Sequence, residues 1–171
     1  DNQFGFKKSL GCSHAVFTLR NVVSYYVSCN STVNICALGM SKAFDKMNHY
    51  GLFIKLMDRQ IPVQLLQLLE FWFRSGLTCV KWGDCFSAFY SQARGIRQGG
   101  VLSPYLFALY IDSVIEKVRR SRVGCEIKLE SVGIIVYADD ILLVAPTVTA
   151  LQLLLSMCEH ELNWLAMSIN A

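Results

Sequence analysis

Residues 134–144 read Ile134-Ile135-Val136-Tyr137-Ala138-Asp139-Asp140-Ile141-Leu142-Leu143-Val144 and carry the strongest structural signal of this chain. Two adjacent carboxylates interrupt a run that is otherwise apolar. The aliphatic residues on either side predict two buried strands, 134–137 and 141–144, joined by a tight turn. Burial of carboxylates among such residues is costly unless something compensates for it. The pattern therefore indicates a hairpin whose acidic tip faces a cleft.

The acidic pair has two explanations. At a hairpin tip, Asp139 and Asp140 can share bound cations, and Mg²⁺ prefers carboxylate oxygens while leaving room for substrate phosphates. Two such ions would activate a primer 3′-hydroxyl and stabilise a departing pyrophosphate. Asp is also a common turn residue, so a purely structural turn is the alternative. The motif alone supports both explanations, and the rest of the chain agrees with the first.

A glycine-rich segment over residues 94–104 is the second signal, Arg-Gly-Ile-Arg-Gln-Gly-Gly-Val-Leu-Ser-Pro. Glycines allow a close approach of the backbone to a ligand, Arg97 can pair with a phosphate, and Gln98 can hydrogen-bond a sugar or base edge. Ser103-Pro104 is explained structurally, as the cap and first turn of a helix to about residue 119. Gln98 has no such explanation, which favours a binding role over an ordinary glycine loop.

The third signal is residues 37–45, Ala-Leu-Gly-Met-Ser-Lys-Ala-Phe-Asp. A buried strand over 33–40 is predicted to lead into a helix over 43–57. Phe44 suits a core position as well as a substrate wall. Asp45 is explained by the favourable placement of a carboxylate in the first turn of a helix.

Helices are further predicted over 14–26, from Pro62 to an end at Gly76, and over 147–165. Residues 77–90, with Gly83-Asp84 at the centre, indicate a β-hairpin. Helices mixed with hairpins predict an α+β fold with a largely antiparallel sheet.

The composition narrows the class of protein. A length of 171 residues, 53% hydrophobic, suits one domain with a real core and excludes disorder. The net charge of +3 is compatible with a polyanionic partner. Seven scattered cysteines without a CxxC pair argue against a secreted disulfide framework and a zinc site. No signal peptide and no apolar run of about 18 residues is present, so we expect an intracellular, non-secreted protein with no membrane partner.

Taken in order, these segments resemble the palm motifs of reverse transcriptases from non-LTR (LINE-type) retrotransposons. A lone Tyr-Ala-Asp-Asp is a weak signal, but the ordered set is specific and covers nearly the whole chain. The matching segments are Gly5-Phe6-Lys7-Lys8, Ser41-Lys42-Ala43-Phe44-Asp45, Asn48-His49, and residues 95–99, 103–107, 137–140 and 164–170.

The resemblance implies a right-hand polymerase palm, an antiparallel sheet with helices packed on one face, plus part of the fingers. It implies one reverse transcriptase domain over residues 1–171, incomplete at both ends, with partial fingers at 1–32 and mainly palm at 33–171. The missing fingers and thumb would belong to the rest of a retroelement polyprotein.

The same resemblance implies an RNA-directed DNA polymerase that uses an RNA template, a DNA primer and deoxynucleoside triphosphates. Asp139 and Asp140 match catalytic carboxylates that bind two Mg²⁺ ions, for which Mn²⁺ can substitute. Phe44 matches the residue that packs under the incoming sugar and rejects a 2′-hydroxyl. Arg97, Gln98 and Gly99 are assigned to nucleotide binding.

The chain departs from the family pattern at Gly39. The family places a third catalytic aspartate there, five residues before the Phe of Ala-Phe, and glycine offers neither a charge nor a ligand oxygen. Loss of a carboxylate that bridges both metals predicts a fall in rate of at least ~10³-fold. We therefore expect this chain to be nearly inactive.

Two other interpretations remain open at the level of sequence. One is a non-catalytic module that keeps the polymerase fold and binds nucleic acid or protein, and Gly39 favours it. The intact Asp139-Asp140, Gln98 and Phe44 favour an enzyme. The other is a reverse transcriptase of the group II intron type, or a telomerase-like polymerase.

Overall fold

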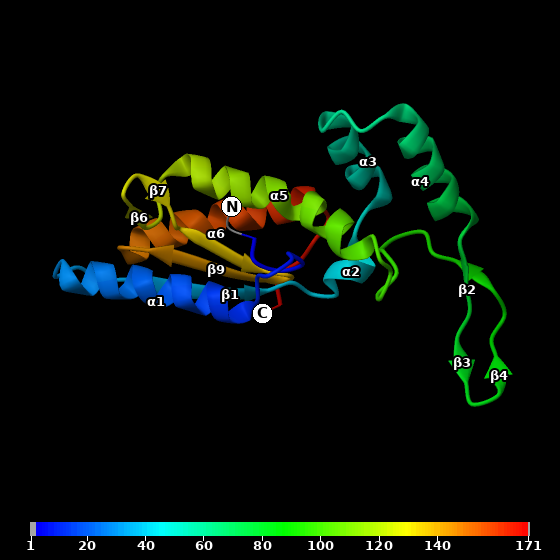
Figure 1. Cartoon of the computed structure of the whole chain (residues 1–171), viewed down its shortest axis with the longest axis horizontal. Helices are drawn as coiled ribbons and strands as arrows, with labels where there is room; N and C mark the ends of the chain where they lie inside the picture. Colours follow the sequence, from blue (N-terminus) through cyan, green and yellow to red (C-terminus); the bar gives the residue numbers. More distant parts are fainter. Residues whose placement is uncertain (1–2, 171) are drawn as a thin grey trace.

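A three-stranded antiparallel sheet in the order β1-β9-β8 forms the centre of the computed structural model, which describes residues 3–170 (Figure 1). The ends of the expected 1–171 domain therefore lie outside the described residues. The central strands are β1 (Asn34–Gly39), β8 (Ile134–Tyr137) and β9 (Asp140–Ala145). β8 and β9 are the two strands predicted around the acidic pair, and the antiparallel α+β class is confirmed.

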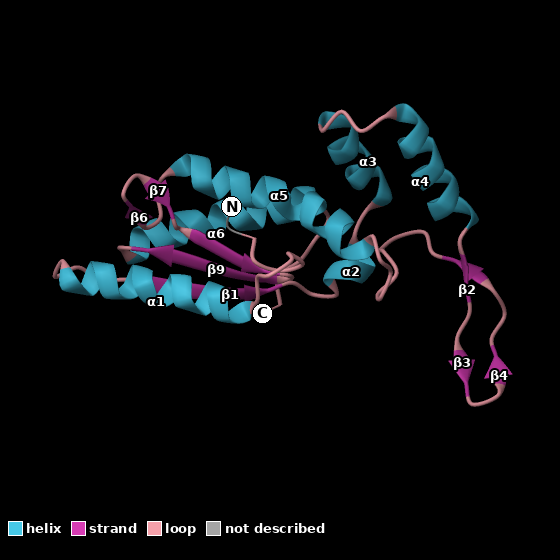
Figure 2. Ribbon diagram, viewed as in Figure 1, coloured by secondary structure: helices cyan, strands magenta, loops and turns pink. Residues whose placement is uncertain are grey.

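The two faces of the sheet bury alternate residues, as the period of two along a strand requires. Ile134, Val136 and Leu143 face the larger core, which contains α5 (Ser103–Ser121) and α6 (Val148–Trp164). Ile135 and Val144 face a smaller core with Ala15 and Val22 of α1 (Cys12–Ser28). Helices thus cover both faces, and the prediction of helices on one face was wrong in this detail (Figure 2). Because helices cover both faces of the sheet, β8 is buried on both sides, and its sequence is therefore strongly apolar.

The helix predicted over residues 43–57 is divided into α2 (Ala43–Lys46) and α3 (His49–Asp58). Asn48 has extended backbone angles, and its side chain accepts a hydrogen bond from the Tyr50 N–H at 2.9 Å. This is the N-cap arrangement that asparagine favours, so a new helix begins at His49. The single-helix prediction was wrong because a capping residue lay inside the apolar pattern.

Three smaller predictions also need correction. β1 is an edge strand with Leu38 as its only buried residue, rather than a fully buried strand. Ser103 is the first helical residue of α5 and does not cap it, because its hydroxyl donates to the Arg97 carbonyl at 2.5 Å. Pro62 is the N-cap of α4 (Val63–Ser75), which ends at Gly76 as predicted.

α4 and the hairpin that follows it project away from the sheet (Figure 1). The hairpin pairs β2 (Leu77–Thr78) with β5 (Tyr90–Ser91), and β3 (Lys81–Trp82) with β4 (Cys85–Phe86). A second small ribbon, β6 (Glu126–Ile127) with β7 (Glu130–Ser131), precedes β8. None of the helices in residues 3–170 combines the length and apolar character needed to cross a membrane.

Candidate active site at the end of the central sheet

The acidic pair lies at the tip of the β8–β9 hairpin. Ala138 and Asp139 form the turn, Asp140 is the first residue of β9, and Tyr137 is its partner across the hairpin. Ala138 has a φ of 55°, in the left-handed region that such tight turns demand. Asp139 is half-buried and Asp140 is exposed, so both carboxylates lie at the surface at one end of the sheet.

Gly39 is directly opposite Asp140 in the β1–β9 register. A Cβ atom built on Gly39 would lie 3.9 Å from the Asp140 Oδ1 atom, which is an ordinary van der Waals contact. The third carboxylate position of the family pattern therefore lies beside the acidic pair, as the sequence predicted. A Cβ atom would therefore fit at position 39 without displacing these neighbours.

The acidic site has one carboxylate fewer than the family pattern provides for binding divalent cations. Within residues 3–170, no cluster of three or more His, Cys, Asp or Glu side chains is placed to hold a metal ion. Asp139 and Asp140 supply oxygen donors of the kind that Mg²⁺ prefers, and Gly39 supplies none. The site thus fits an incomplete version of the expected metal centre.

The turn that carries the carboxylates is held from the N-terminal segment. Gln3 is buried, and its side-chain carbonyl accepts hydrogen bonds from the N–H groups of Ala138 at 3.2 Å and Gly5 at 2.8 Å. Its amide donates to the Ala138 carbonyl at 3.4 Å. Gly5 lies so close that an added Cβ would be 2.3 Å from the Ala138 nitrogen. Sequence reasoning missed Gln3, and the only available signal was its position two residues before the Gly5-Phe6 of the family motif.

Asn170 adds a further polar group on the other side of Gly39. Residues 168–170 run alongside β1, with Asn170 N–H donating to the Gly39 carbonyl at 2.8 Å. The Asn170 amide nitrogen would be 3.9 Å from a Cβ atom at position 39. The Ser-Ile-Asn segment of the family pattern thus lines the acidic site, a role that the sequence alone did not assign.

Phe44 lies in a cluster of three aromatic rings. Its ring stacks on Phe107 of α5 with centroids 4.7 Å apart and meets Phe6 edge-on at 6.0 Å. Phe44 is nevertheless only half-buried, so one part of the ring serves the core while the rest reaches the surface. Both of the roles considered for Phe44 are compatible with this position.

The glycine loop is anchored on the segment that contains Phe44. Gly95 N–H donates to the Met47 carbonyl at 2.7 Å, and Ile96 N–H donates to the Phe44 carbonyl at 2.8 Å. A Cβ on Gly95 would be 2.6 Å from the Asp45 carbonyl oxygen, and its φ is +80°, so glycine is required at this position. The ring of His49 is 2.6 Å from the Gly95 carbonyl, which fixes the loop from a second side.

Gln98 and Asp45 meet across this junction. The Gln98 amide donates to the Asp45 carboxylate at 3.4 Å, and both side chains are exposed. Asp45 lies on α2, as predicted, and is therefore a partner of the loop and no substitute for the carboxylate missing at position 39.

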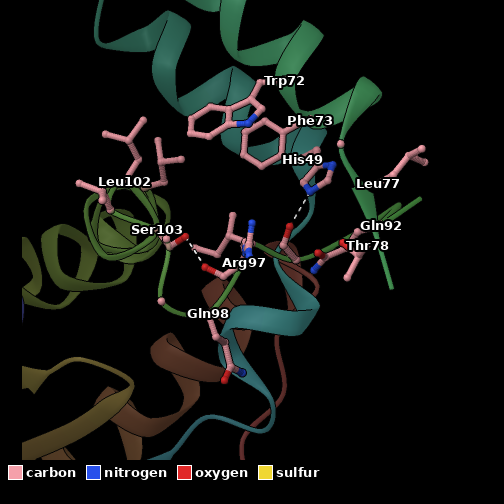
Figure 3. Close-up of a pocket in the computed structure, with 17 residues that line it drawn as sticks. His49, Trp72, Phe73, Leu77, Thr78, Gln92, Arg97, Gln98, Leu102 and Ser103 are labelled. Atoms are coloured by element: carbon pink, nitrogen blue, oxygen red, sulfur yellow. Dashed lines mark hydrogen bonds between the residues drawn. The ribbon is translucent and has the colours of Figure 1, made fainter. Parts of the chain in front are cut away.

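The loop also borders a pocket of about 440 Å³ (Figure 3). Arg97 and Gln98 line it from below, and Trp72, Phe73 and His49 line it from above. Gly99 is also part of the lining. Phe44 and the acidic pair are not part of its lining. The structure thus divides the predicted residues into an acidic site at the end of the sheet and a glycine loop that lines a pocket next to the projecting α4 and hairpin.

Comparisons with known proteins agree on one family. The chain matches the family described as reverse transcriptase (RNA-dependent DNA polymerase) over residues 1–171. It is 31% identical over 129 residues to the Pol polyprotein of the type-1 retrotransposable element R2 of Nasonia vitripennis, covering 75% of this chain and 12% of that protein. It is 28% identical over 173 residues to the R2DM polyprotein of Drosophila melanogaster, covering 99% of this chain and 16% of that protein. The chain therefore spans about an eighth to a sixth of the length of these relatives.

Solved structures show the same fold. The chain superposes on telomerase from Candida albicans, in complex with a fragment of telomeric RNA, with a TM-score of 0.70 and 14% identity. That match covers 99% of this chain and 31% of the telomerase chain. Together with the ordered motifs and the acidic end of the sheet, the family match over residues 1–171 leads to one conclusion: the chain belongs to the reverse transcriptase (RNA-dependent DNA polymerase) family, among the polymerases of non-LTR retrotransposons.

Proposed function

We propose that this chain is the palm region of a polymerase that adds deoxynucleotides to a DNA primer on an RNA template, and that Gly39 impairs the reaction. Asp139 and Asp140 would hold Mg²⁺, or Mn²⁺ in its place. The bound cations would assist ionisation of the primer 3′-hydroxyl and neutralise the departing pyrophosphate. The fingers, the thumb and any further domains would come from the rest of a retroelement polyprotein.

The β1–β9 register is the observation that carries this proposal. It brings Gly39 opposite Asp140, at the end of the sheet where Asp139 also lies. Three positions from two distant segments of sequence thus meet at one point, as the family chemistry requires. The domain division, with partial fingers at 1–32 and mainly palm at 33–171, remains part of the proposal.

The nucleotide-binding roles are also proposed. The glycine loop is joined to the Phe44 segment by Ile96 N–H and by the Gln98 side chain, which supports a surface for an incoming nucleotide formed by Arg97, Gln98 and Gly99, with Phe44 under its sugar. Arg97 is exposed and supplies a positive charge for a phosphate. Gln98 retains a free donor hydrogen on its amide for a second hydrogen bond.

Primer extension on an RNA template tests the proposal directly. Purified wild-type protein is compared with Gly39→Asp and with Gly39→Asn, which has the same shape but no charge. We expect Gly39→Asp to extend the primer at least about 10³-fold faster than wild type, because the missing carboxylate stabilises the transition state. Gly39→Asn should remain close to wild type. Equal rates in wild type and Gly39→Asp would contradict the proposed effect of Gly39.

A non-catalytic binding module that retains the polymerase fold is the second candidate. The incomplete donor set favours it, because Gly39 leaves two carboxylates where the family has three. Under this alternative, Asp139→Asn would leave both Mn²⁺ binding and nucleic-acid binding unchanged. Under the polymerase proposal, the same substitution weakens the residual Mn²⁺ binding.

A further inference from the structure

Residues 3–6 lie along the outer edge of β8, between the acidic turn and the rings around Phe44. Gln3 forms a parallel bridge with Val136 of β8, and Phe4 N–H donates to the Val136 carbonyl at 2.8 Å. The segment therefore adds a short stretch of sheet on the side of β8 that faces away from β9. Its two ends make different contacts, one with the turn that carries the carboxylates and one with the aromatic cluster.

The Gln3 end of this segment holds one residue of the turn by both of its backbone polar groups. The Gln3 side-chain carbonyl accepts from Ala138 N–H at 3.2 Å, and its amide donates to the Ala138 carbonyl at 3.4 Å. A primary amide can accept and donate at once, whereas a carboxylate only accepts and an apolar side chain does neither. Because Ala138 directly precedes Asp139, this pair of hydrogen bonds fixes the backbone from which the Asp139 carboxylate extends.

The Phe6 end of the segment holds the aromatic cluster. The Phe6 ring meets Phe44 edge-on with centroids 6.0 Å apart, and it meets Phe107 in the same manner at 6.5 Å. Edge-to-face ring pairs of this kind are favourable. Phe6 also has a φ of 62°, in a left-handed region that is uncommon for residues with a Cβ and persists where neighbouring contacts hold it. The two ring contacts can hold Phe6 in this conformation.

Gly5 packs tightly against the turn between these two ends. A Cβ atom on Gly5 would be 2.3 Å from the Ala138 nitrogen. On the far side of the cluster, the Phe44 carbonyl accepts from Ile96 N–H of the glycine loop at 2.8 Å. Direct contacts thus run from the acidic turn to the glycine loop. Close-packed contacts transmit a displacement, because they leave no space to absorb it.

We propose that residues 3–6 are a positioning segment that couples the acidic turn to the Phe44 ring, with Gln3 and Phe6 as its two contacts. The segment sets the separation between the carboxylates and the ring on which a nucleotide sugar would rest. Transfer to the nucleotide depends on such a separation, because the reacting groups must be held in line. This role rests on the proposed function, but the coupling itself belongs to the fold and can be measured without a cation or a nucleotide.

Hydrogen exchange measured by nuclear magnetic resonance tests the coupling in the wild-type chain. Three backbone amides serve as reporters, one at each end of the path and one at the opposite end of the sheet. They are Ala138 N–H, bonded to Gln3, Ile96 N–H, bonded to the Phe44 carbonyl, and Val144 N–H, bonded to the Gly133 carbonyl. A general loss of stability would accelerate exchange at all three, so Val144 is the internal reference.

Gln3→Met and Phe6→Leu each remove one contact of the segment. We expect each variant to accelerate exchange at the far reporter, Ile96 and Ala138 respectively, by about 2- to 30-fold relative to Val144. The matched controls are Gln152→Met on α6 and Phe17→Leu on α1, both at exposed positions, and they should leave the three amides unchanged. Acceleration confined to the amide nearest the substituted residue would overturn the proposal, as would an equal increase at all three reporters.

Titration with Mn²⁺, followed by electron paramagnetic resonance, tests the consequence for the acidic site. We expect Gly39→Asp/Phe6→Leu to bind Mn²⁺ about 2- to 30-fold more weakly than Gly39→Asp, because the coupled turn no longer holds the carboxylates in place. A purely structural role for Phe6 would lower stability and leave the Mn²⁺ affinity of the folded protein unchanged. Equal affinity in the two proteins would therefore overturn the proposal. Failure of Gly39→Asp itself to bind Mn²⁺ would instead contradict the proposed function, and hydrogen exchange would then decide on the coupling.

Discussion

Gly5 shows how a residue without a side chain positions the acidic pair. It lies against the turn of the β8–β9 hairpin, and its own N–H donates to the buried Gln3 side chain. The same side chain holds the Ala138 peptide next to Asp139. The N-terminal segment thus acts as a brace that fixes the backbone of the turn.

Gly5→Ala should therefore destabilise the turn. A Cβ there would lie 2.3 Å from the Ala138 nitrogen, so either the brace or the turn must move. We expect a loss of about 1–3 kcal/mol in the free energy of unfolding, measured by urea denaturation. Gly11→Ala is the control, because a Cβ on Gly11 meets only the Ser13 hydroxyl, at 3.9 Å. Equal stability of Gly5→Ala and wild type would contradict the proposed role of the N-terminal segment in fixing the turn.

The sequence predicted the acidic residues but not their support. The apolar strands on either side identified Asp139 and Asp140, whereas only the family resemblance placed Gly39 in the same site. The contact between Gln3 and Ala138 joins residues 135 positions apart, and no periodicity reports such a contact. The Gln98–Asp45 hydrogen bond was missed for the same reason.

At the scale of elements, Tyr110 joins three helices at one buried point. Its hydroxyl donates to the Leu165 carbonyl at the end of α6, at 2.5 Å, and accepts from the Asn48 N–H at the start of α3. Tyr110 itself lies on α5 and is completely buried. Burial raises the pKa of its phenol, so the hydroxyl stays protonated and keeps donating.

Tyr110→Phe should loosen the junction of α3, α5 and α6. The substitution leaves two backbone groups without their partner, which costs about 1–3 kcal/mol of unfolding free energy. Thermal unfolding measures the loss, and hydrogen exchange should increase most at the start of α3. Tyr105→Phe on the same helix is the control, because Tyr105 is 61% exposed. An identical loss in both variants would show that the buried hydroxyl has no special role.

Helices with a long hydrophobic repeat were predicted well from the sequence. Helices whose ends are set by a capping side chain were predicted less well. α1, α4, α5 and α6 agree with the sequence within a few residues. The division of residues 43–58 into α2 and α3 depends on one side-chain hydrogen bond of Asn48, which an apolar pattern does not reveal. Tertiary packing places α1 on the second face of the sheet. The amphipathic pattern of α1 alone is compatible with packing on either face.

At the scale of the whole molecule, the main core lies between the sheet and the pair α5 and α6. Cys158 of α6 is fully buried there. Burial raises the pKa of its thiol from 9.0 to about 12. The folded protein therefore keeps a proton that the unfolded chain releases as the pH rises above about 9.

This difference predicts a loss of stability in alkali. The buried, protonated thiol makes its full contribution to the free energy of unfolding below about pH 9. This contribution disappears as the pH approaches 12. We expect the unfolding free energy to fall with pH in this window, and to fall less steeply in Cys158→Ala despite the lower overall stability of that variant. Cys85→Ala, at an exposed position, should retain the wild-type slope. Parallel slopes in all three proteins would contradict this origin.

The whole-molecule arrangement also explains why the exposed apolar residues gather on α4 and the hairpin. α4 contributes Leu69 to the main core, but α4 and the hairpin project away from the sheet and expose Phe71, Trp72 and Trp82. The chain spans only 12% and 16% of the two R2 polyproteins, so such a surface is compatible with further partners. Composition indicated a mildly basic protein, and the fold shows that exposed rings lie on α4 and the hairpin, where Arg74 and Lys81 are balanced by Glu70 and Asp84.

An aspartate at position 39 is proposed to complete a metal site with Asp139 and Asp140. Titration with Mn²⁺, followed by electron paramagnetic resonance, tests it on wild type, Gly39→Asp and the double variant Gly39→Asp/Asp140→Asn. We predict that Gly39→Asp binds Mn²⁺ at least about tenfold more tightly than wild type, and that the double variant loses this gain. Equal affinity in wild type and Gly39→Asp, or a gain that survives in the double variant, would contradict the shared site.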